Sequence, residues 1–310
     1  MTERLGADQA GIDRAALLLR AGQLISFPTE TVYGLGADAE NDRAVAGVFA
    51  AKGRPSLNPL IVHVPDIAAA RRYVVWSDTA DRVASAFWPG PLTLVLPLAD
   101  GHGISRLVTA GLDTLAIRVP AHPVAQRLLT VFGGPVAAPS ANLSGQISPT
   151  RAEHVLSCLD GRIAAVLDAG PTAVGVESTI LGLVSDPEVL RPGGLPLEAL
   201  GACLGGEVPR SNVPSTISAP GQLASHYAPK ATLRLNAMSK GAGETLLGFG
   251  DVAGDETLST TGDLVEAAAQ LFEMLHRLDA RGLPMAVAPI PDRGLGIAIN
   301  DRLRRASAPR

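Results

Sequence analysis

Residues 24–36 read LISFPTETVYGLG, an apolar run followed by a polar segment, and they indicate an α/β fold. The apolar part, Leu24–Phe27, predicts a strand that ends at Pro28. Two hydroxyls, a carboxylate and a phenol follow, before two glycines. Polar side chains just beyond the carboxyl end of a strand lie where α/β proteins usually bind ligands. The segment therefore fits either a ligand-binding loop or an ordinary polar turn.

Outward from this stretch, strand and helix patterns alternate along the first two-thirds of the chain. Further strands are predicted at Leu60–Val64, Leu92–Leu96, Leu115–Val119, Pro135–Ala138, Ala164–Leu167 and Thr179–Val184. Helices are predicted at Ala15–Leu19, from the Asn41 and Asp42 caps to Gly53, after Asp66, at Pro123–Phe132 and from Pro149 to about Leu159. Several connections are too short for a helix, so we expect a mixed sheet.

The pattern divides the chain into three parts. Residues 1–204 form the first α/β domain, and residues 205–230, rich in proline and without an apolar period, are predicted to be a linker. Residues 231–310 alternate strand and helix again and predict a small βαβ-type domain.

Composition restricts the possible classes of protein. The net charge is −4, so a polycationic nucleic-acid binder is not indicated. Two cysteines, Cys158 and Cys203, form no C-x-x-C pair, so neither a zinc site nor a disulfide framework is expected. The chain has no signal-peptide pattern and no apolar run of membrane-spanning length, from which we expect a soluble cytoplasmic protein without membrane contact.

Cations follow the helix that ends near Gly53. Lys52 and Arg54 precede a loop held by Pro55 and Pro59, which also presents Asn58. Either cation alone would suit a solvated helix end, where it stabilises the dipole. A rigid loop presenting Lys, Arg and Asn also suits a triphosphate, because Arg grips phosphate bidentately and Lys acts as a point charge.

Two further segments carry candidate binding groups. Ser140 and Ser148 belong to small-hydroxyl loops that could hold an anion or simply cap a helix. Arg118 interrupts an otherwise apolar strand, where it would pair either with a carboxylate of the protein or with one of a ligand. His63 also lies on an apolar strand and by itself suggests a core histidine.

Taken together and in this order, these segments resemble the L-threonylcarbamoyladenylate synthases of the YrdC-type family. The matching runs are FPTETVYGLG, AAKGRPSLNPLIVH, WPGPLTLVLP, TLAIRVPAHP, APSANLSGQ and VESTIL…LRPGG, over most of residues 20–195. The later runs APGQLASHYAPK and GLGIAINDRLRRA resemble the longer, two-domain branch. The resemblance implies a YrdC-type twisted mixed open sheet with helices, followed by a Rossmann-like domain.

The resemblance also implies roles for individual residues. ATP contacts are expected for Lys52, Arg54, Asn58, Thr114, Ser140, Ser148, Arg191 and Tyr227, and threonine contacts for Thr31, His63, Arg118, Ala138 and Ser178. Lys52 and Arg54 would be the catalytic clamp, and Tyr227 would close the site as part of a lid.

The implied reaction joins L-threonine, bicarbonate and ATP. Threonine and bicarbonate give an N-carboxy-threonine, whose carboxylate attacks the α-phosphate of ATP and displaces pyrophosphate. Mg²⁺ would accompany ATP. The product would serve tRNA N6-threonylcarbamoyladenosine formation through a downstream transferase. Two alternatives are a double-stranded-RNA or tRNA-binding module without adenylation chemistry and a carbamoyl-transfer module of the hydrogenase-maturation kind.

Overall fold

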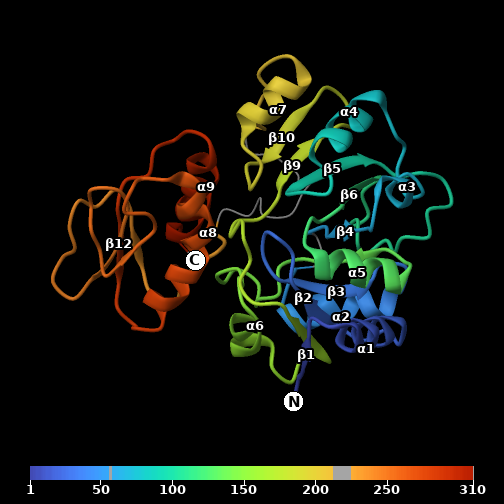
Figure 1. Cartoon of the computed structure of the whole chain (residues 1–310), viewed down its shortest axis with the longest axis horizontal. Helices are drawn as coiled ribbons and strands as arrows, with labels where there is room; N and C mark the ends of the chain where they lie inside the picture. The colour runs from blue at the N-terminus through green and yellow to red at the C-terminus, as the bar shows by residue number, and fades with distance from the viewer. Residues whose placement is uncertain (56–57, 212–224, 310) are drawn as a thin grey trace.

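The computed structural model describes residues 1–55, 58–211 and 225–309, which form two α/β domains (Figure 1). The first contains strands β1 (Glu3–Gly6), β2 (Ile25–Phe27), β3 (Gly34–Asp38), β4 (Ile61–His63), β5 (Leu92–Pro97), β6 (Thr114–Arg118), β7 (Val136–Ala137), β8 (Ala165–Asp168), β9 (Thr179–Gly182) and β10 (Glu188–Arg191). Its helices are α1 (Gln9–Arg20), α2 (Asp42–Lys52), α3 (Ile67–Ala70), α4 (Asp78–Phe87), α5 (Pro123–Phe132), α6 (Ala152–Leu159) and α7 (Leu197–Leu204).

The described strands of the first domain form one sheet in the order β1-β8-β2-β3-β7-β4-β6-β5-β9-β10. Neighbours β4 and β6 are parallel, as are β5 and β9, whereas β2 and β3 are antiparallel and so are β5 and β6. The expectation of a mixed sheet is confirmed.

Helices cover the two faces of this sheet unequally. One apolar cluster joins α2, α4 and α6 to one face, through residues such as Val48, Val83 and Val155. A second cluster joins α1 and α5 to the other face, over strands β1, β8, β2 and β7. Residues of β4 and β6, such as Ile61 and Ala116, belong to a separate small cluster outside it.

The second domain is a small parallel sheet with two helices. Strands β11 (Leu233–Arg234), β14 (Met285–Val287), β12 (Thr245–Gly248) and β13 (Glu256–Thr257) pair in that order. Helices α8 (Leu264–Asp279) and α9 (Leu295–Ser307) lie between this sheet and the first domain (Figure 1). The predicted βαβ-type arrangement is confirmed.

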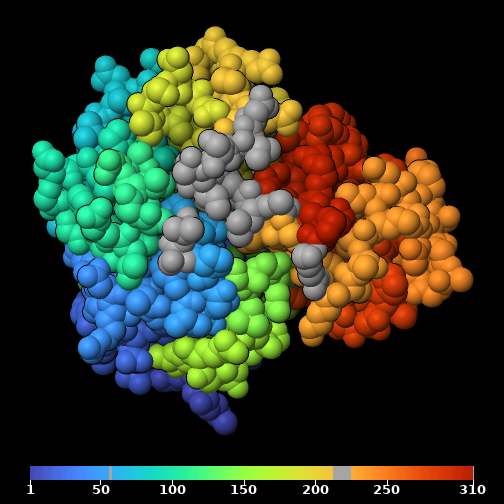
Figure 2. All heavy atoms as spheres, turned by 180° about the vertical axis from the view of Figure 1, so that it is seen from behind, coloured from blue at the N-terminus to red at the C-terminus, as the bar shows by residue number. Residues whose placement is uncertain are grey.

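The two domains share one apolar core. Val32, Ile147 and Val176 of the first domain are buried in the same cluster as Phe272 of α8 and Tyr227 of the connecting segment. Glu198 of α7 also accepts a hydrogen bond from the Gly294 amide of the second domain at 3.0 Å. Figure 2 shows the red C-terminal part of the chain against the yellow part of the first domain. The second domain is thus packed firmly against the first.

Local sequence explains most element boundaries. Asn41 caps α2 by accepting from two backbone amides, and Gly53 ends it in the left-handed conformation, as predicted. Helix α1 is longer than the predicted Ala15–Leu19, because Asp8 caps it and starts it at Gln9. Helix α6 begins at Ala152, later than the predicted Pro149.

The connecting segment is only partly described. Helix α7 ends at Leu204 and β11 begins at Leu233, within a few residues of the predicted linker bounds. Residues 212–224 of the predicted linker lie outside the described residues. Among the described helices, none is both long and apolar enough to cross a membrane.

Gly175 should be essential for the packing of the two domains. A Cβ there would lie 2.3 Å from the carbonyl oxygen of Ala268 on α8, whereas Gly170, with a similar positive φ, has open space. We expect Gly170→Ala to lower the free energy of unfolding by roughly 1–2 kcal/mol through backbone strain alone. Gly175→Ala should add about 1–3 kcal/mol for overpacking. Urea denaturation measures both; equal losses would contradict the close contact.

Candidate functional site

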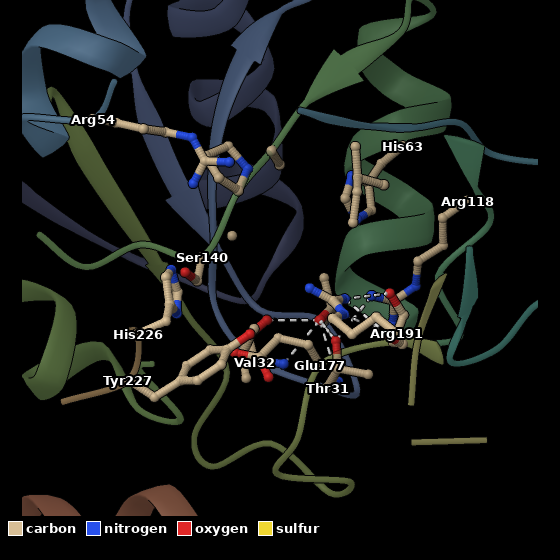
Figure 3. Close-up of a pocket in the computed structure, with 16 residues that line it drawn as sticks. Thr31, Val32, Arg54, His63, Arg118, Ser140, Glu177, Arg191, His226 and Tyr227 are labelled. Atoms are coloured by element: carbon tan, nitrogen blue, oxygen red, sulfur yellow. Dashed lines mark hydrogen bonds between the residues drawn. The ribbon is translucent and has the colours of Figure 1, made fainter. Parts of the chain in front are cut away.

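A pocket lies on the sheet face that α1 and α5 leave uncovered. His63 on β4 and Arg118 on β6 point into it from paired positions at the carboxyl ends of these parallel strands. Most of the predicted site residues line this pocket: Thr31, Arg54, His63, Arg118, Ala138, Ser140, Ser178, Arg191 and Tyr227. Figure 3 shows His63, Arg118 and Arg191 on one side of it and Arg54, Ser140, His226 and Tyr227 on the other.

Arg118 is held from three directions. It forms an ion pair with Glu30 at 2.6 Å, donates to the Thr31 hydroxyl at 2.9 Å and donates to the Gly90 carbonyl at 3.2 Å. It therefore has the partner within the protein that its buried position requires. Because it also lines the pocket, a ligand carboxylate would meet a guanidinium that is already oriented.

The polar residues after β2 form a loop that is held by internal hydrogen bonds and faces the pocket. The Thr29 hydroxyl donates to the Val32 carbonyl at 2.6 Å and lies 2.8 Å from the Thr31 hydroxyl. Thr29, Thr31 and Val32 all line the pocket. Of the two interpretations of LISFPTETVYGLG, the structure favours the ligand-binding loop.

Arg54 and Lys52 are buried near the other side of the pocket. Arg54 lines it and donates to the Pro59 carbonyl at 3.1 Å, and burial lowers the pKa of Arg54 to about 10. Lys52 donates to the carbonyls of Ser140, at 2.5 Å, and Asn142. Burial, together with the charge of Arg54, holds the pKa of Lys52 well below its usual range. Lys52 thus braces the Ser140 loop in this structure.

Three other predicted nucleotide contacts, Asn58, Ser148 and Thr114, are not among the residues that line the pocket. The Asn58 side chain is buried and its amide atoms have no hydrogen-bond partner among the described residues. Ser148 donates its hydroxyl to Glu177, which does line the pocket. Thr114 begins β6, four residues before Arg118 and on the same face, because alternate strand residues point the same way. Their roles toward a nucleotide stay predictions.

Arg191 and Ser178 form a second organised pair in the pocket. Arg191 donates to the Ser178 carbonyl at 2.8 Å and to its hydroxyl at 3.2 Å. Ser178 also shares a 2.7 Å hydrogen bond with Thr93. Burial lowers the pKa of Arg191, although nearby carboxylates support its charge. The pair places a third guanidinium, besides Arg54 and Arg118, on the pocket wall.

Two buried histidines in the pocket are neutral. Burial lowers the pKa of His63 to about 3, with the charge of Arg118 acting in the same direction, and burial lowers the pKa of His226 to about 3. The Nδ1 atoms of both lack a hydrogen-bond partner among the described residues. A ligand with hydrogen-bonding groups could satisfy them.

Sequence reasoning missed Glu177 and Arg302. Glu177 lines the pocket, and Arg302 of α9 reaches it from the second domain with Nε 2.7 Å from a Glu177 oxygen. Arg302 also lies beneath Tyr227, with its guanidinium carbon 5.0 Å from the ring centre. One signal was present: Arg302 occupies a helical position between the apolar residues Ile299 and Leu303, on the buried face of α9.

The pocket is suited to a small polyanion. Its wall carries three buried guanidinium groups, and its carboxylate Glu177 is already paired with Arg302. Among the described residues, no group of three or more His, Cys, Asp or Glu side chains could hold a metal ion. The arrangement can orient a carboxylate through Arg118 and bind phosphates through Arg54 and Arg191.

Comparison with family models gives two matches. Residues 17–193 match the Sua5/YciO/YrdC model, described as "Telomere recombination". Residues 195–308 match the model described as the C-terminal domain of threonylcarbamoyl-AMP synthase.

Individual relatives agree with these matches. The chain is 40% identical to the threonylcarbamoyl-AMP synthase of Bacillus subtilis, covering 100% of this chain and 96% of the relative. It is 41% identical to that of Pyrococcus abyssi, covering 94% and 93%. The crystal structure of P. abyssi Sua5 complexed with L-threonine has a TM-score of 0.91 and 38% identity, covering 99% of this chain and 97% of that one.

The neutral state of His63 should appear in the pH dependence of stability. His63 has a pKa of about 3 in the folded protein against an ordinary 6.5, so the unfolded chain binds the extra proton between these values. Stability is therefore lost as pH falls from 6.5 toward 3. We expect His63→Gln to reduce this slope by roughly 1.4 kcal/mol per pH unit in mid-window. Urea unfolding at a series of pH values measures it, and an unchanged slope would contradict a neutral His63.

Proposed function

Because this chain belongs to the Sua5/YciO/YrdC family and carries the C-terminal domain of the threonylcarbamoyl-AMP synthases, we propose that it is an L-threonylcarbamoyladenylate synthase. It is a nucleotidyltransferase that forms threonylcarbamoyl-AMP and pyrophosphate from L-threonine, bicarbonate and ATP. The observation that carries the proposal is one pocket whose wall carries three buried guanidinium groups, Arg118 and Arg191 on one side and Arg54 on the other.

Threonine is placed at the Arg118 side of the pocket. Its carboxylate would pair with Arg118, whose orientation is fixed by Glu30 and Thr31. His63, neutral and with an unsatisfied Nδ1 among the described residues, lies near enough to Arg118 to sense its charge. The match to a P. abyssi structure containing L-threonine supports threonine as the substrate. Ala138 and Ser178 would enclose the rest of the amino acid.

ATP is placed at the side that carries Arg54, Ser140 and Tyr227. Arg54 on this side and Arg191 across the pocket would bind phosphate oxygens, and Asn58 could supply its buried amide. Lys52 would contribute in one of two ways. It would hold the Ser140 loop in position for the phosphates, or its amino group would turn and bind a phosphate directly. Because these groups are buried, their interaction with phosphate is screened less than it would be in water.

The chemistry then follows from alignment and charge. The threonine nitrogen bonds to the bicarbonate carbon with loss of water, which gives N-carboxy-threonine. A carboxylate oxygen of this carbamate attacks the α-phosphorus, and the bond to the bridging oxygen breaks to release pyrophosphate. Two anions must approach each other, so the main task of Arg54, Lys52 and Arg191 is to offset their repulsion and fix their geometry.

Mg²⁺ is proposed to enter with ATP rather than to occupy a site made by the protein. The carboxylates nearest the pocket are already engaged, Glu30 with Arg118 and Glu177 with Arg302. Phosphate oxygens would therefore be its principal ligands, and the ion would neutralise part of the triphosphate charge.

The product is proposed to supply the threonylcarbamoyl group of tRNA N6-threonylcarbamoyladenosine through a downstream threonylcarbamoyl transferase. This would take place in the cytoplasm, where ATP and tRNA occur together.

RNA binding without chemistry is the second candidate function. The buried, unsatisfied polar groups Asn58 and His63 favour a small ligand, because a duplex cannot reach them. Pyrophosphate release separates the two functions.

Arg118 should govern the threonine requirement. Arg118→Gln would leave Glu30 buried without its cation, so we expect the double variant Glu30→Gln/Arg118→Gln to be the better-folded test protein. Its KM for threonine should rise about tenfold to a hundredfold, with KM for ATP changed less than about threefold. Glu30→Gln alone, which keeps Arg118, is the matched control. Equal increases in both KM values would reassign Arg118.

Pyrophosphate release tests the function directly. Purified protein with ATP and Mg²⁺ should release pyrophosphate only when L-threonine and bicarbonate are both present, because the carbamate is the nucleophile. A coupled phosphate assay measures it, and mass spectrometry should detect threonylcarbamoyl-AMP. A folded protein that binds ATP without releasing pyrophosphate would contradict the proposal and direct attention to RNA affinity.

A further inference from the structure

We propose that Arg302, on the last helix of the second domain, is a positioning residue that neutralises Glu177 and so lets the pocket of the first domain accept the phosphates of ATP. This inference deepens the proposed function, on which it rests for the identity of the nucleotide. It gives the second domain a defined part in the site.

Arg302 reaches the first domain as a fully buried cation. It is 0% exposed, and its Nε and Nη1 atoms lie 2.7 Å from oxygens of Glu177 and Asp301. Its guanidinium also lies against the Tyr227 ring. Such a cation is stable in the interior only with carboxylate partners, so its position is determined by Glu177 as much as by α9.

Glu177 faces the pocket and is ionised there. It lines the pocket next to Ser178, and its second oxygen accepts the Ser148 hydroxyl. Burial alone would raise the pKa of Glu177, but the charges of Arg302 and Arg191 hold it below its usual range. A carboxylate is thus maintained on the wall of a site for a polyanion.

An ionised Glu177 without Arg302 would repel a triphosphate. Coulomb repulsion between like charges is strong where solvent is largely excluded. The pair with Arg302 cancels the charge, while Ser148 and Arg302 together fix the direction of the side chain. If Arg302 were lost, Asp301 would still pair with Arg305 at 3.1 Å. Glu177 is therefore the carboxylate whose charge neutralisation depends most on Arg302.

A purely structural role would have a different signature. If Arg302 only joined the domains, its loss would affect all ligands of the pocket alike, whatever their charge. If it neutralises Glu177, its loss should weaken binding in proportion to the negative charge of the ligand. Removing the carboxylate as well should then restore binding.

The experiment measures dissociation constants of Mg-ATP and of adenosine by calorimetry, without threonine or turnover. The proteins are wild type, Arg302→Met, Glu177→Gln and the double variant. We expect Arg302→Met to weaken Mg-ATP binding about tenfold or more, and adenosine binding less than about threefold. The double variant should bind Mg-ATP within about threefold of Glu177→Gln.

Two results would overturn the inference: equal losses for Mg-ATP and adenosine in Arg302→Met, or a double variant no better than Arg302→Met. If Arg302→Met does not fold, as judged by thermal unfolding, Arg302→Lys is compared with Arg302→Gln. Mg-ATP binding kept by the lysine and lost by the glutamine supports the inference, and equal behaviour contradicts it. A wild type that binds Mg-ATP but releases no threonine-dependent pyrophosphate would contradict only the proposed function.

Discussion

The need to keep several cationic side chains buried in and beside one pocket is the constraint on which the rest of this structure depends. Lys52, Arg54, Arg118 and Arg191 are each less than 10% exposed. Burying such groups is costly unless oxygen atoms meet them. The protein supplies these mainly from backbone carbonyls, at Ser140, Pro59 and Ser178, which satisfy a cation without adding negative charge. Arg118 also pairs with a carboxylate, that of Glu30. The loops that carry these carbonyls are therefore as much a part of the site as the cations.

The order of the elements could be predicted from sequence, but not all of their extents or neighbours. Apolar runs marked β4, β5 and β6, and Asn41 with Gly53 marked α2, because these signals are local. Strand β1 was missed, since Glu3–Gly6 has a single buried residue and, among the described strands, pairs only with β8, far along the chain. The predicted helix at Ala15–Leu19 was too short, because the apolar period of α1 alone does not reveal the Asp8 cap. Strand order is set by such distant pairings, which a linear pattern does not record.

The candidate site divides in the same way. The resemblance identified Thr31, Arg54 and Arg118 as site residues through the runs FPTETVYGLG, AAKGRPSLNPLIVH and TLAIRVPAHP, and all three line the pocket. They did not show which way a side chain turns: Lys52 points to carbonyls and Ser148 to Glu177. Pairing of Glu177 with Arg302 spans 125 residues and two domains, so neither local motif could indicate it. What remained hidden is the network that holds the site, rather than its recognisable members.

The apolar core that runs from the first domain into the second also limits how this chain can evolve. Val32, Ile147 and Val176 are buried in one cluster with Tyr227 and residues of α8. If gene fission separated the two domains, these side chains would form an exposed hydrophobic patch on one product. The apolar face of α8 would be exposed on the other. The two products would have to re-associate, or each would need polar substitutions on this surface to stay soluble by itself. Although the protein has two sheets, its two domains are in this sense constrained to evolve together.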